Sequence, residues 1–357
     1  MGYPFGNDPS KVENYKKFWN RQPVDRPLTG FSFKTWFSIL EYSATRKWRT
    51  NEWLTPDMVL PENFLEDQEK LLKEGEVLDD DILRGACPLQ GIRWFPAFLG
   101  FDLQILGESI SSRDKCLSWE EIDNLKLDFN TPWFQKYIEF TQVLVKHAKG
   151  RYPVSHGTLV GPSDMGAILR GHTQMAYDLF DSPEQTAAMF QKMGRFFCRI
   201  LEEQRKHIPL FQSGYFDAQY QLWAPEPTIR LQEDNAFLFS PQLYRKFLQP
   251  ADREMAASYP CSFIHLHSTS MYLLDAFLEI EEIRAFQMNI EPFNIPCKGM
   301  IPYFRQVQQA ERPLLIRGSF EPDELKLVLD SLDPAGLYLY IMVRDEKEAD
   351  ILKKILL

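Results

Sequence analysis

The stretch Ser262-Phe-Ile-His-Leu-His-Ser268 opens the pattern that decides the fold. Its apolar residues favour a strand, and strand side chains alternate between two faces. His265 and His267 therefore share one face, and Ile264 and Leu266 share the other. In a barrel the aliphatic face would meet the surrounding helices, and the histidine face would point into the interior near the end of the strand.

The same unit of strand and helix recurs up to the C-terminus. Alternating strands and helices imply parallel strands joined by right-handed crossovers. The expected strands of this part are 262–268, 285–290, 314–320 and 337–343. Further strand candidates precede them at 28–33, somewhere within 90–106, at 152–157 and at 213–219. Together these eight segments predict an α/β fold, a single (β/α)8 TIM barrel.

The barrel is expected to occupy residues 1–357 as a single domain, with 1–25 as an N-terminal helical extension. Residues 222–234 separate a strand from the next helix and are interpreted as a long loop. Loops of that length are usually functional or disordered. The segment therefore counts as a candidate part of the site.

Composition narrows the class of function. The net charge of −10, without an offsetting basic block, argues against nucleic acid as a partner. The five cysteines are scattered and odd in number, unlike a disulfide framework, which favours a reducing compartment. No secretory signal and no long apolar run is visible, so a cytoplasmic enzyme acting on a small molecule, away from membranes, is expected.

Polar residues share the inward face at the ends of several expected strands. Buried charges are costly unless they are paired, so convergence on a site explains them better than packing does. The inward candidates are His156, Asp217, Gln219, His265, His267, Asn289, Glu291, Arg317 and Glu321. Two structural alternatives remain open: the histidines are hydrogen-bonded core residues, or Arg317 pairs with Glu291 or Glu321 in a network under a loop.

Short motifs between about 150 and 345 carry a resemblance to a known family. They are Leu159-Val-Gly-Pro162, Leu169-Arg-Gly171, Asp178-Leu-Phe180, Ser182-Pro-Glu184, Gln232-Glu-Asp234, Phe239-Ser-Pro241, His265-Leu-His-Ser268 and Arg317-Gly-Ser-Phe-Glu-Pro322. In order and spacing the chain resembles the uroporphyrinogen decarboxylase superfamily. That family of barrels also contains methyltransferases that move methyl groups between corrinoid proteins and coenzyme M or tetrahydrofolate.

The chain departs from the decarboxylases of that superfamily. Their arginine-bearing N-terminal segment is replaced by Phe31-Ser-Phe-Lys-Thr-Trp36, and their C-terminal histidine by Met342-Val-Arg-Asp345. A substrate with eight carboxylates needs a basic cavity, and few arginines lie near the expected strand ends. Turnover of uroporphyrinogen itself is therefore not expected.

The resemblance implies a metal site of altered composition. The coenzyme M methyltransferases carry His-x-Cys at the fifth strand and another Cys near the last strand, and these ligands hold zinc. Here the pair is His265 and His267, which could bind zinc together with Glu291, Cys297 or Glu321. The tetrahydrofolate-using relatives do not need that zinc, so a metal-free site is an open alternative.

The leading hypothesis is methyl transfer between a methylated corrinoid, carried by a partner protein, and a small acceptor of the thiol or tetrahydrofolate type. The catalytic candidates are Asp217, His156, Glu291 and Glu321; the substrate-binding candidates are Arg317, Gln219, Trp223, Arg230 and Asn289; the metal candidates are His265, His267 and Cys297. The 222–234 loop would help to close over the corrinoid.

Two other classes of enzyme remain as alternatives. The first is a decarboxylase or related lyase that grips a smaller carboxylate through Arg317 or Arg230. The second is a metal-dependent hydrolase, a class that also uses His-x-His on a barrel strand. The partners expected are a small-molecule substrate, a corrinoid-binding protein and a second copy of the chain, with neither nucleic acid nor a membrane among them.

Overall fold

The computed structural model describes residues 2–291 and 294–356, and its centre is a six-stranded parallel sheet. The strand order is β1-β11-β10-β9-β8-β7. The bounds are β1 (Leu28–Ser32), β7 (Thr228–Gln232), β8 (Cys261–Leu266), β9 (Ala285–Asn289), β10 (Leu314–Gly318) and β11 (Leu337–Met342). The expectation of an α/β fold with parallel strands is confirmed.

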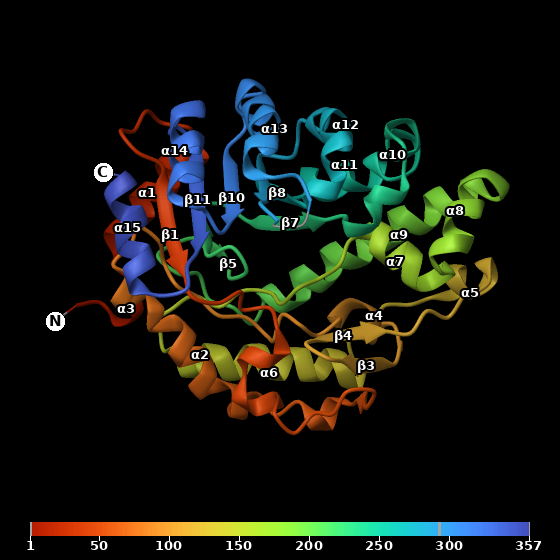
Figure 1. Ribbon diagram of the computed structural model, residues 1–357. Coiled ribbons are helices and arrows are strands. Elements are labelled where there is room, and N and C mark those ends of the chain that lie inside the picture. The colour runs from red at the N-terminus through yellow and green to blue at the C-terminus, as the bar shows by residue number, and fades with distance from the viewer. Residues whose placement is uncertain (1, 292–293, 357) are drawn as a thin grey trace.

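Helices cover the outer face of this sheet (Figure 1). They are α10 (Pro241–Phe247), α11 (Gln249–Ala257), α12 (Leu274–Leu278), α13 (Cys297–Gln309), α14 (Pro322–Ser331) and α15 (Glu346–Leu356). The outward residues of β8, Ile264 and Leu266, belong to the main hydrophobic core with these helices. Phe263 on the opposite face belongs to a second, inner cluster. The predicted alternation of faces is thus confirmed for β8.

The other half of the molecule is mainly helical. It contains α2 (Leu65–Leu72), α3 (Glu74–Leu78), α4 (Trp94–Phe98), α5 (Trp119–Asn124), α6 (Pro132–Ala148), α7 (Pro162–Arg170), α8 (His172–Asp181) and α9 (Pro183–Arg205). A small antiparallel sheet is formed by β2 (Trp53–Leu54), β3 (Leu103–Leu106) and β4 (Ser109–Ser112). Two extended segments meet in a single parallel bridge between Ala86 and Val154.

The expected strand within 90–106 is wrong. This segment forms α4 and β3, and β3 pairs antiparallel with β2 and β4 outside the central sheet. The extended chain at Ala86 comes directly before it and makes the parallel bridge to Val154. The aromatic run 94–98 misled the prediction because its residues are buried on every side of a short helix.

The expected strand at 213–219 is also misplaced. Its core forms β5 (Tyr215–Asp217), which pairs antiparallel with β6 (Leu222–Ala224) in a separate hairpin. The strand that joins the parallel sheet is β7, which lies inside the supposed 222–234 loop. Pro225 and Pro227 lie just before it and make its start look like a loop in the sequence.

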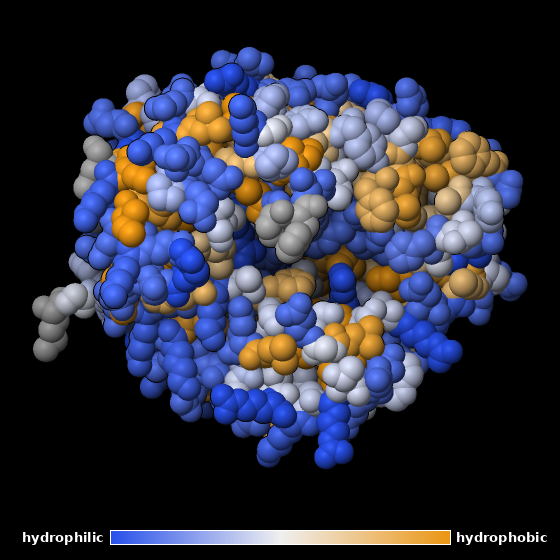
Figure 2. Space-filling view, viewed as in Figure 1, coloured by the Kyte–Doolittle hydropathy of each residue, from blue (hydrophilic) through white to orange (hydrophobic). Residues whose placement is uncertain are grey.

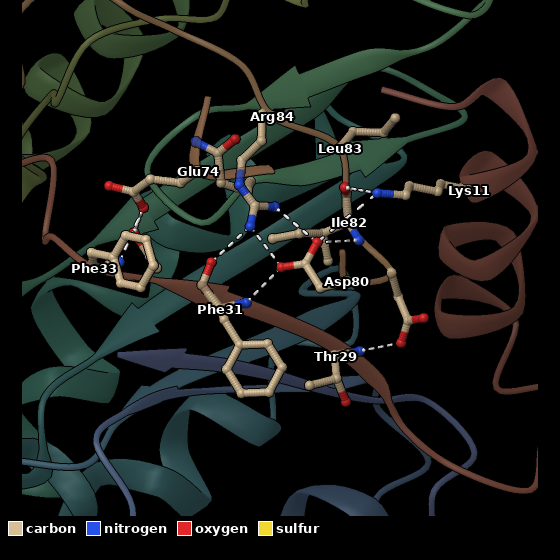
Figure 3. Close-up of polar contacts among 12 residues, drawn as sticks. Lys11, Thr29, Phe31, Phe33, Glu74, Asp80, Ile82, Leu83 and Arg84 are labelled. Carbon is tan, nitrogen blue, oxygen red and sulfur yellow. Dashed lines mark hydrogen bonds and ion pairs between the residues drawn. The ribbon is translucent and has the colours of Figure 1, made fainter. Parts of the chain in front are cut away.

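Side chains, rather than a neighbouring strand, satisfy the free edge of β1 (Figure 3). The backbone N–H of Phe31 donates to Asp80 at 2.8 Å, and the Phe31 carbonyl accepts from Arg84 at 2.7 Å. Thr29 is bound in the same way, through its N–H, by the carboxylate of Asp81 at 3.1 Å. Within the described residues, the hydrogen-bonded ladder therefore stops at six strands, and the predicted closed eight-stranded barrel is not formed by backbone pairing.

The hairpin of β5 and β6 fills the interior between the sheet and the N-terminal helix α1 (Val12–Trp19). Tyr15 of α1 donates its hydroxyl to the Gln221 carbonyl at 2.7 Å, and Trp19 donates to the Trp223 carbonyl at 2.8 Å. Tyr338 of β11 donates to the Tyr220 carbonyl at 3.0 Å. The hairpin therefore supports the interior from the end where the strands begin.

Among the described residues, no helix has the length and apolar composition needed to cross a bilayer.

Candidate functional site

The two histidines lie on the inner face at the carboxyl end of β8, as their alternation predicted. His265 is buried and pairs in register with Gln232 of β7 and Gln287 of β9. His267 follows the end of the strand and is about one third exposed (34%). In Figure 1 the arrowheads of β1 and β10 point toward the middle of the molecule, and Figure 2 shows a hollow in the middle of this face.

Each imidazole is held through its Nδ1 atom. Nδ1 of His265 contacts the side-chain oxygen of Gln287 and the hydroxyl of Tyr220, the latter at 2.7 Å. Nδ1 of His267 contacts a carboxylate oxygen of Glu291. Carbonyl and carboxylate oxygens only accept, so both Nδ1 atoms are assigned as donors, and in the neutral form of each ring the Nε2 atom carries a lone pair.

The two Nε2 atoms face each other at 3.1 Å. Two nitrogen lone pairs at that distance repel unless a proton or a cation lies between them. Asp234, which follows β7, adds a third ligand atom: its Oδ1 lies 3.5 Å from Nε2 of His267 and has no hydrogen-bond partner. The ligand atoms of Asp234, His265 and His267 all lie within 4.8 Å of one another.

This geometry fits a divalent metal ion such as zinc. Bonds of about 2.0–2.1 Å at tetrahedral angles would hold two nitrogens roughly 3.3 Å apart. The spacings of 3.1 and 3.5 Å lie on either side of that value, and the third spacing, between Asp234 and His265, is at most 4.8 Å, so Asp234 would move closer to bind the ion. One carboxylate and two imidazoles would leave a fourth position of a tetrahedral ion open to a substrate.

The surroundings shift the pKa values of these residues in different directions, and a metal ion would have to displace a proton from His267. Burial, together with the charge of His267, lowers the pKa of His265 to about 3, so this imidazole is neutral at pH 7. Burial also lowers the pKa of His267, but its hydrogen bond to Glu291 and the charge of Asp234 outweigh burial and raise it. Burial raises the pKa of Glu291, yet hydrogen bonds from His267 and Ser268 outweigh burial and lower it to about 2.

Asp164 of α7 positions the segment that carries Asp234. Its carboxylate accepts from the backbone N–H of Asp234 at 3.1 Å and from the amide of Asn235 at 2.9 Å. Burial and the charge of Asp234 raise the pKa of Asp164 well above its usual value. Gly161 allows this close approach, because a Cβ there would meet the Gln232 carbonyl oxygen at 1.8 Å.

A second polar group lies deeper in the interior. Nη1 of Arg230 donates to both carboxylate oxygens of Asp217, at 2.9 and 3.2 Å, and Nε2 of His156 lies 3.4 Å from the nearer oxygen. All three residues are buried. Burial and the charge of Arg230 lower the pKa of His156 to about 4. Tyr220 joins this group to the metal candidates, since its ring lies 5.6 Å from the Arg230 guanidinium and its hydroxyl contacts His265.

Other predicted substrate-binding residues surround Tyr220. Arg317 lies 5.7 Å from its ring and donates to the Thr35 carbonyl at 2.7 Å. Gln219 donates to the Tyr220 hydroxyl at 3.3 Å, and Asn289 accepts from Gln287 at 2.9 Å. Within the described part of the chain, no carboxylate lies within 4.0 Å of Arg317, so the expected alternative of a pair with Glu291 or Glu321 is not found.

Three predicted site residues lie elsewhere. Cys297 is buried in the core at the start of α13, where burial raises the pKa of its thiol to about 11, and it is not among the converging ligands. Glu321 is exposed and immediately precedes α14, because β10 ends at Gly318 and the strand alternation does not extend to it. Trp223 belongs to β6 and donates to the Phe211 carbonyl at 2.9 Å.

Sequence reasoning missed Asp234, Tyr220 and Asp164. Asp234 could have been found, since it comes two residues after the inward Gln232, but the prolines before β7 make this strand look like a loop. Tyr220 lies in the turn of a hairpin that enters the interior, which no periodicity in the sequence signals. Asp164 lies on a helix and reaches the site only through the backbone it binds.

Comparisons with known proteins found a shared fold but no related sequence. Neither the protein-family models nor the curated proteins gave a match to the sequence. Among solved structures, a methyltransferase from Methanosarcina mazei superposes with a TM-score of 0.63, covering 97% of this chain and 97% of its own. The two chains share one fold. Their sequences are only 13% identical, so the likeness shows the architecture alone.

Proposed function

We propose that this protein is a methyltransferase that moves a methyl group between a methylated corrinoid, carried by a partner protein, and a small acceptor at a zinc centre. The observation that carries the proposal is the convergence of Asp234, His265 and His267 on one point at the carboxyl ends of the strands. The shared fold with a protein named as a methyltransferase supports it. The resemblance to the uroporphyrinogen decarboxylase superfamily, drawn from the motifs, points the same way.

Asp234, His265 and His267 would hold the zinc, which when bound supplies a Lewis acid that lowers the pKa of a thiol or water. Glu291 fixes the ring of His267, and Gln287 and Tyr220 fix the ring of His265. Such outer contacts orient metal ligands and raise their basicity.

The residues around Tyr220 would orient the acceptor. Arg317 offers a cation without a carboxylate partner among the described residues, and Asn289 presents its amide on the same inner face. Asp217 holds Arg230 below them, with His156 kept neutral by burial. Such residues would raise the rate mainly by holding the acceptor in position beside the ion.

The test is methyl transfer by the zinc-loaded protein from methylcobalamin, used in place of the carried corrinoid, to a series of small thiols and to tetrahydrofolate. We expect acceptor-dependent loss of the methyl–cobalt absorption. His267→Ala should abolish both zinc binding and transfer while leaving thermal stability nearly unchanged, because its side chain is partly exposed.

His172→Ala is the matched control, since His172 is a more exposed histidine (54%) on α8. It should retain zinc and activity. Transfer that persists in His267→Ala, or the absence of transfer to every acceptor, would contradict the proposal.

Metal-dependent hydrolysis is a second candidate, because a carboxylate and two imidazoles without a thiolate also form the ligand set of hydrolytic zinc sites. This candidate predicts zinc-dependent cleavage of an ester or amide in the absence of any methyl donor. A panel of chromogenic esters and amides, assayed with the wild-type protein and His267→Ala, separates it from methyl transfer.

A further inference from the structure

A cavity of about 210 Å³ opens beside the central sheet, away from the metal candidates. It lies where the extended segment 153–156 and β7 run without a backbone hydrogen bond between them in the described structure. Its walls are mostly apolar and include Leu201, Ile208, Leu210, Phe211 and Phe216. An apolar cavity of about 150 Å³ in another protein is known to bind benzene, so the space is large enough for a ring-sized body.

Arg205, the last residue of α9, lines this cavity. Its guanidinium lies 4.6 Å from the ring of Tyr259 and 5.7 Å from that of Tyr215, and it donates to the Thr228 carbonyl. No carboxylate of the described residues lies within 4.0 Å of it, and its only hydrogen-bond partner there is that carbonyl. Burial lowers the pKa of Arg205, so its charge gains from an anion beside it.

His156 also lines the cavity. Its Nδ1 faces the Gly157 carbonyl at 2.7 Å, so Nδ1 carries the proton. Its Nε2 is buried, has no hydrogen-bond partner, and belongs to a residue that is only 7% exposed. Because Asp217 lies 3.4 Å from this nitrogen, the same imidazole borders both the cavity and the interior of the candidate site.

We propose that this cavity binds a small carboxylate with an apolar body. Arg205 takes the carboxylate between two tyrosine rings, and the apolar walls enclose the body. Leu210, which lines the same cavity, is 56% exposed, and the apolar body of the ligand would cover this exposed side chain. An occupant would touch His156, which lies next to Asp217, and would therefore perturb the pair of Asp217 and Arg230. The site is separate from the metal candidates and does not depend on the function proposed for them.

The experiment uses benzoate as the probe, titrated by calorimetry into the zinc-loaded full chain. We expect saturable binding at one site, and at least about tenfold weaker binding of benzyl alcohol, which lacks the charge. Arg205→Gln should weaken benzoate binding at least about tenfold. Arg199→Gln, an exposed arginine on the same helix, should bind as the wild type does.

Ile208→Trp provides an independent variant, because it narrows the cavity from a half-buried position without removing a charge. It should abolish binding. In spectra of ¹⁵N-labelled histidine, benzoate should shift the Nε2 resonance of His156 and leave that of exposed His172 unchanged.

Three results would overturn the inference. The first is the absence of saturable benzoate binding to the wild-type protein. The second is wild-type affinity in folded Arg205→Gln or in Ile208→Trp. The third is binding that survives both variants and disappears in His267→Ala, because that result would place benzoate at the metal candidates.

Discussion

Two buried pairs of aspartate and arginine use their charges differently. Asp80 and Arg84 are each 1% exposed, and so are Asp217 and Arg230. Arg84 divides its donors between Asp80 and the Phe31 carbonyl, and none of its nitrogens is buried without a partner (Figure 3). Arg230 gives only Nη1 to Asp217, and its Nε and Nη2 are buried without partners.

The difference separates a structural role from a candidate functional one. The carboxylate of Asp80 also accepts from the backbone of Phe31 and Ile82, so the pair takes the place of a neighbouring strand at the edge of β1. Arg230 turns its unpartnered edge toward an interior that also holds the unpartnered Nε2 of His156. Buried polar atoms without partners are rare, and they gather where water or a ligand completes the network.

The largest effect on stability is expected for Asp80→Asn. It leaves the Arg84 guanidinium buried without its counter-charge, so the free energy of unfolding should fall by about 3 kcal/mol. Chemical denaturation measures this. Arg26→Ala, which breaks the exposed pair of Arg26 and Asp81, is the control and should cost less than about 1 kcal/mol. Equal costs for the two variants would remove the structural role given to Asp80.

Asp217→Asn should cost activity as well as stability. It leaves the Arg230 guanidinium buried without its counter-charge, so the free energy of unfolding should fall by up to about 3 kcal/mol. Methyl transfer should fall at least about tenfold, since Arg230 is released below Tyr220. Paired measurements of activity and denaturation in both asparagine variants test the comparison. Activity retained in Asp217→Asn would erase the distinction.

A third buried carboxyl has no arginine or lysine as a partner in the described structure. Asp252 of α11 accepts from Tyr244 at 2.5 Å, and burial raises its pKa to about 7. The folded state therefore holds a proton that the unfolded state releases between about pH 4 and 7, so stability falls as the pH rises through that window.

Asp252→Asn removes the part of this titration that belongs to Asp252, while the neighbouring buried carboxyl of Glu233, whose pKa burial and Asp252 raise, remains. The variant should match the wild type near pH 4 and exceed its free energy of unfolding by about 1 kcal/mol or more at pH 8. Thermal unfolding across pH 4–8 measures the difference. A variant that is less stable than the wild type at pH 8 would show that the carboxylate is compensated by contacts other than burial.

Site residues were predicted correctly from the sequence where strand pairing fixes the face that each side chain takes. Predictions failed for residues outside the paired strands. His265, Asn289 and Arg317 lie inward on β8, β9 and β10, as their alternation predicted, because a parallel ladder fixes which face each side chain takes. Glu321 lies beyond the end of the ladder, where this rule no longer applies.

The rest depended on contacts between segments far apart in the chain. The ladder beyond β1 is replaced by Asp80 and Arg84, and a pattern of strands cannot show that side chains will take over. Two prolines just before β7 concealed this strand, and with it the metal candidate Asp234. Cys297 was chosen for its thiol, and its place in the core follows from helix packing instead.

X-ray absorption spectroscopy at the zinc edge of the metal-loaded protein tests the central claim most directly. We predict a first shell of nitrogen and oxygen only, with the signature of two imidazoles, that is unchanged in Cys297→Ala and lost in Asp234→Ala. A sulfur scatterer at about 2.3 Å, or a spectrum unaltered by Asp234→Ala, would contradict a centre built from Asp234, His265 and His267.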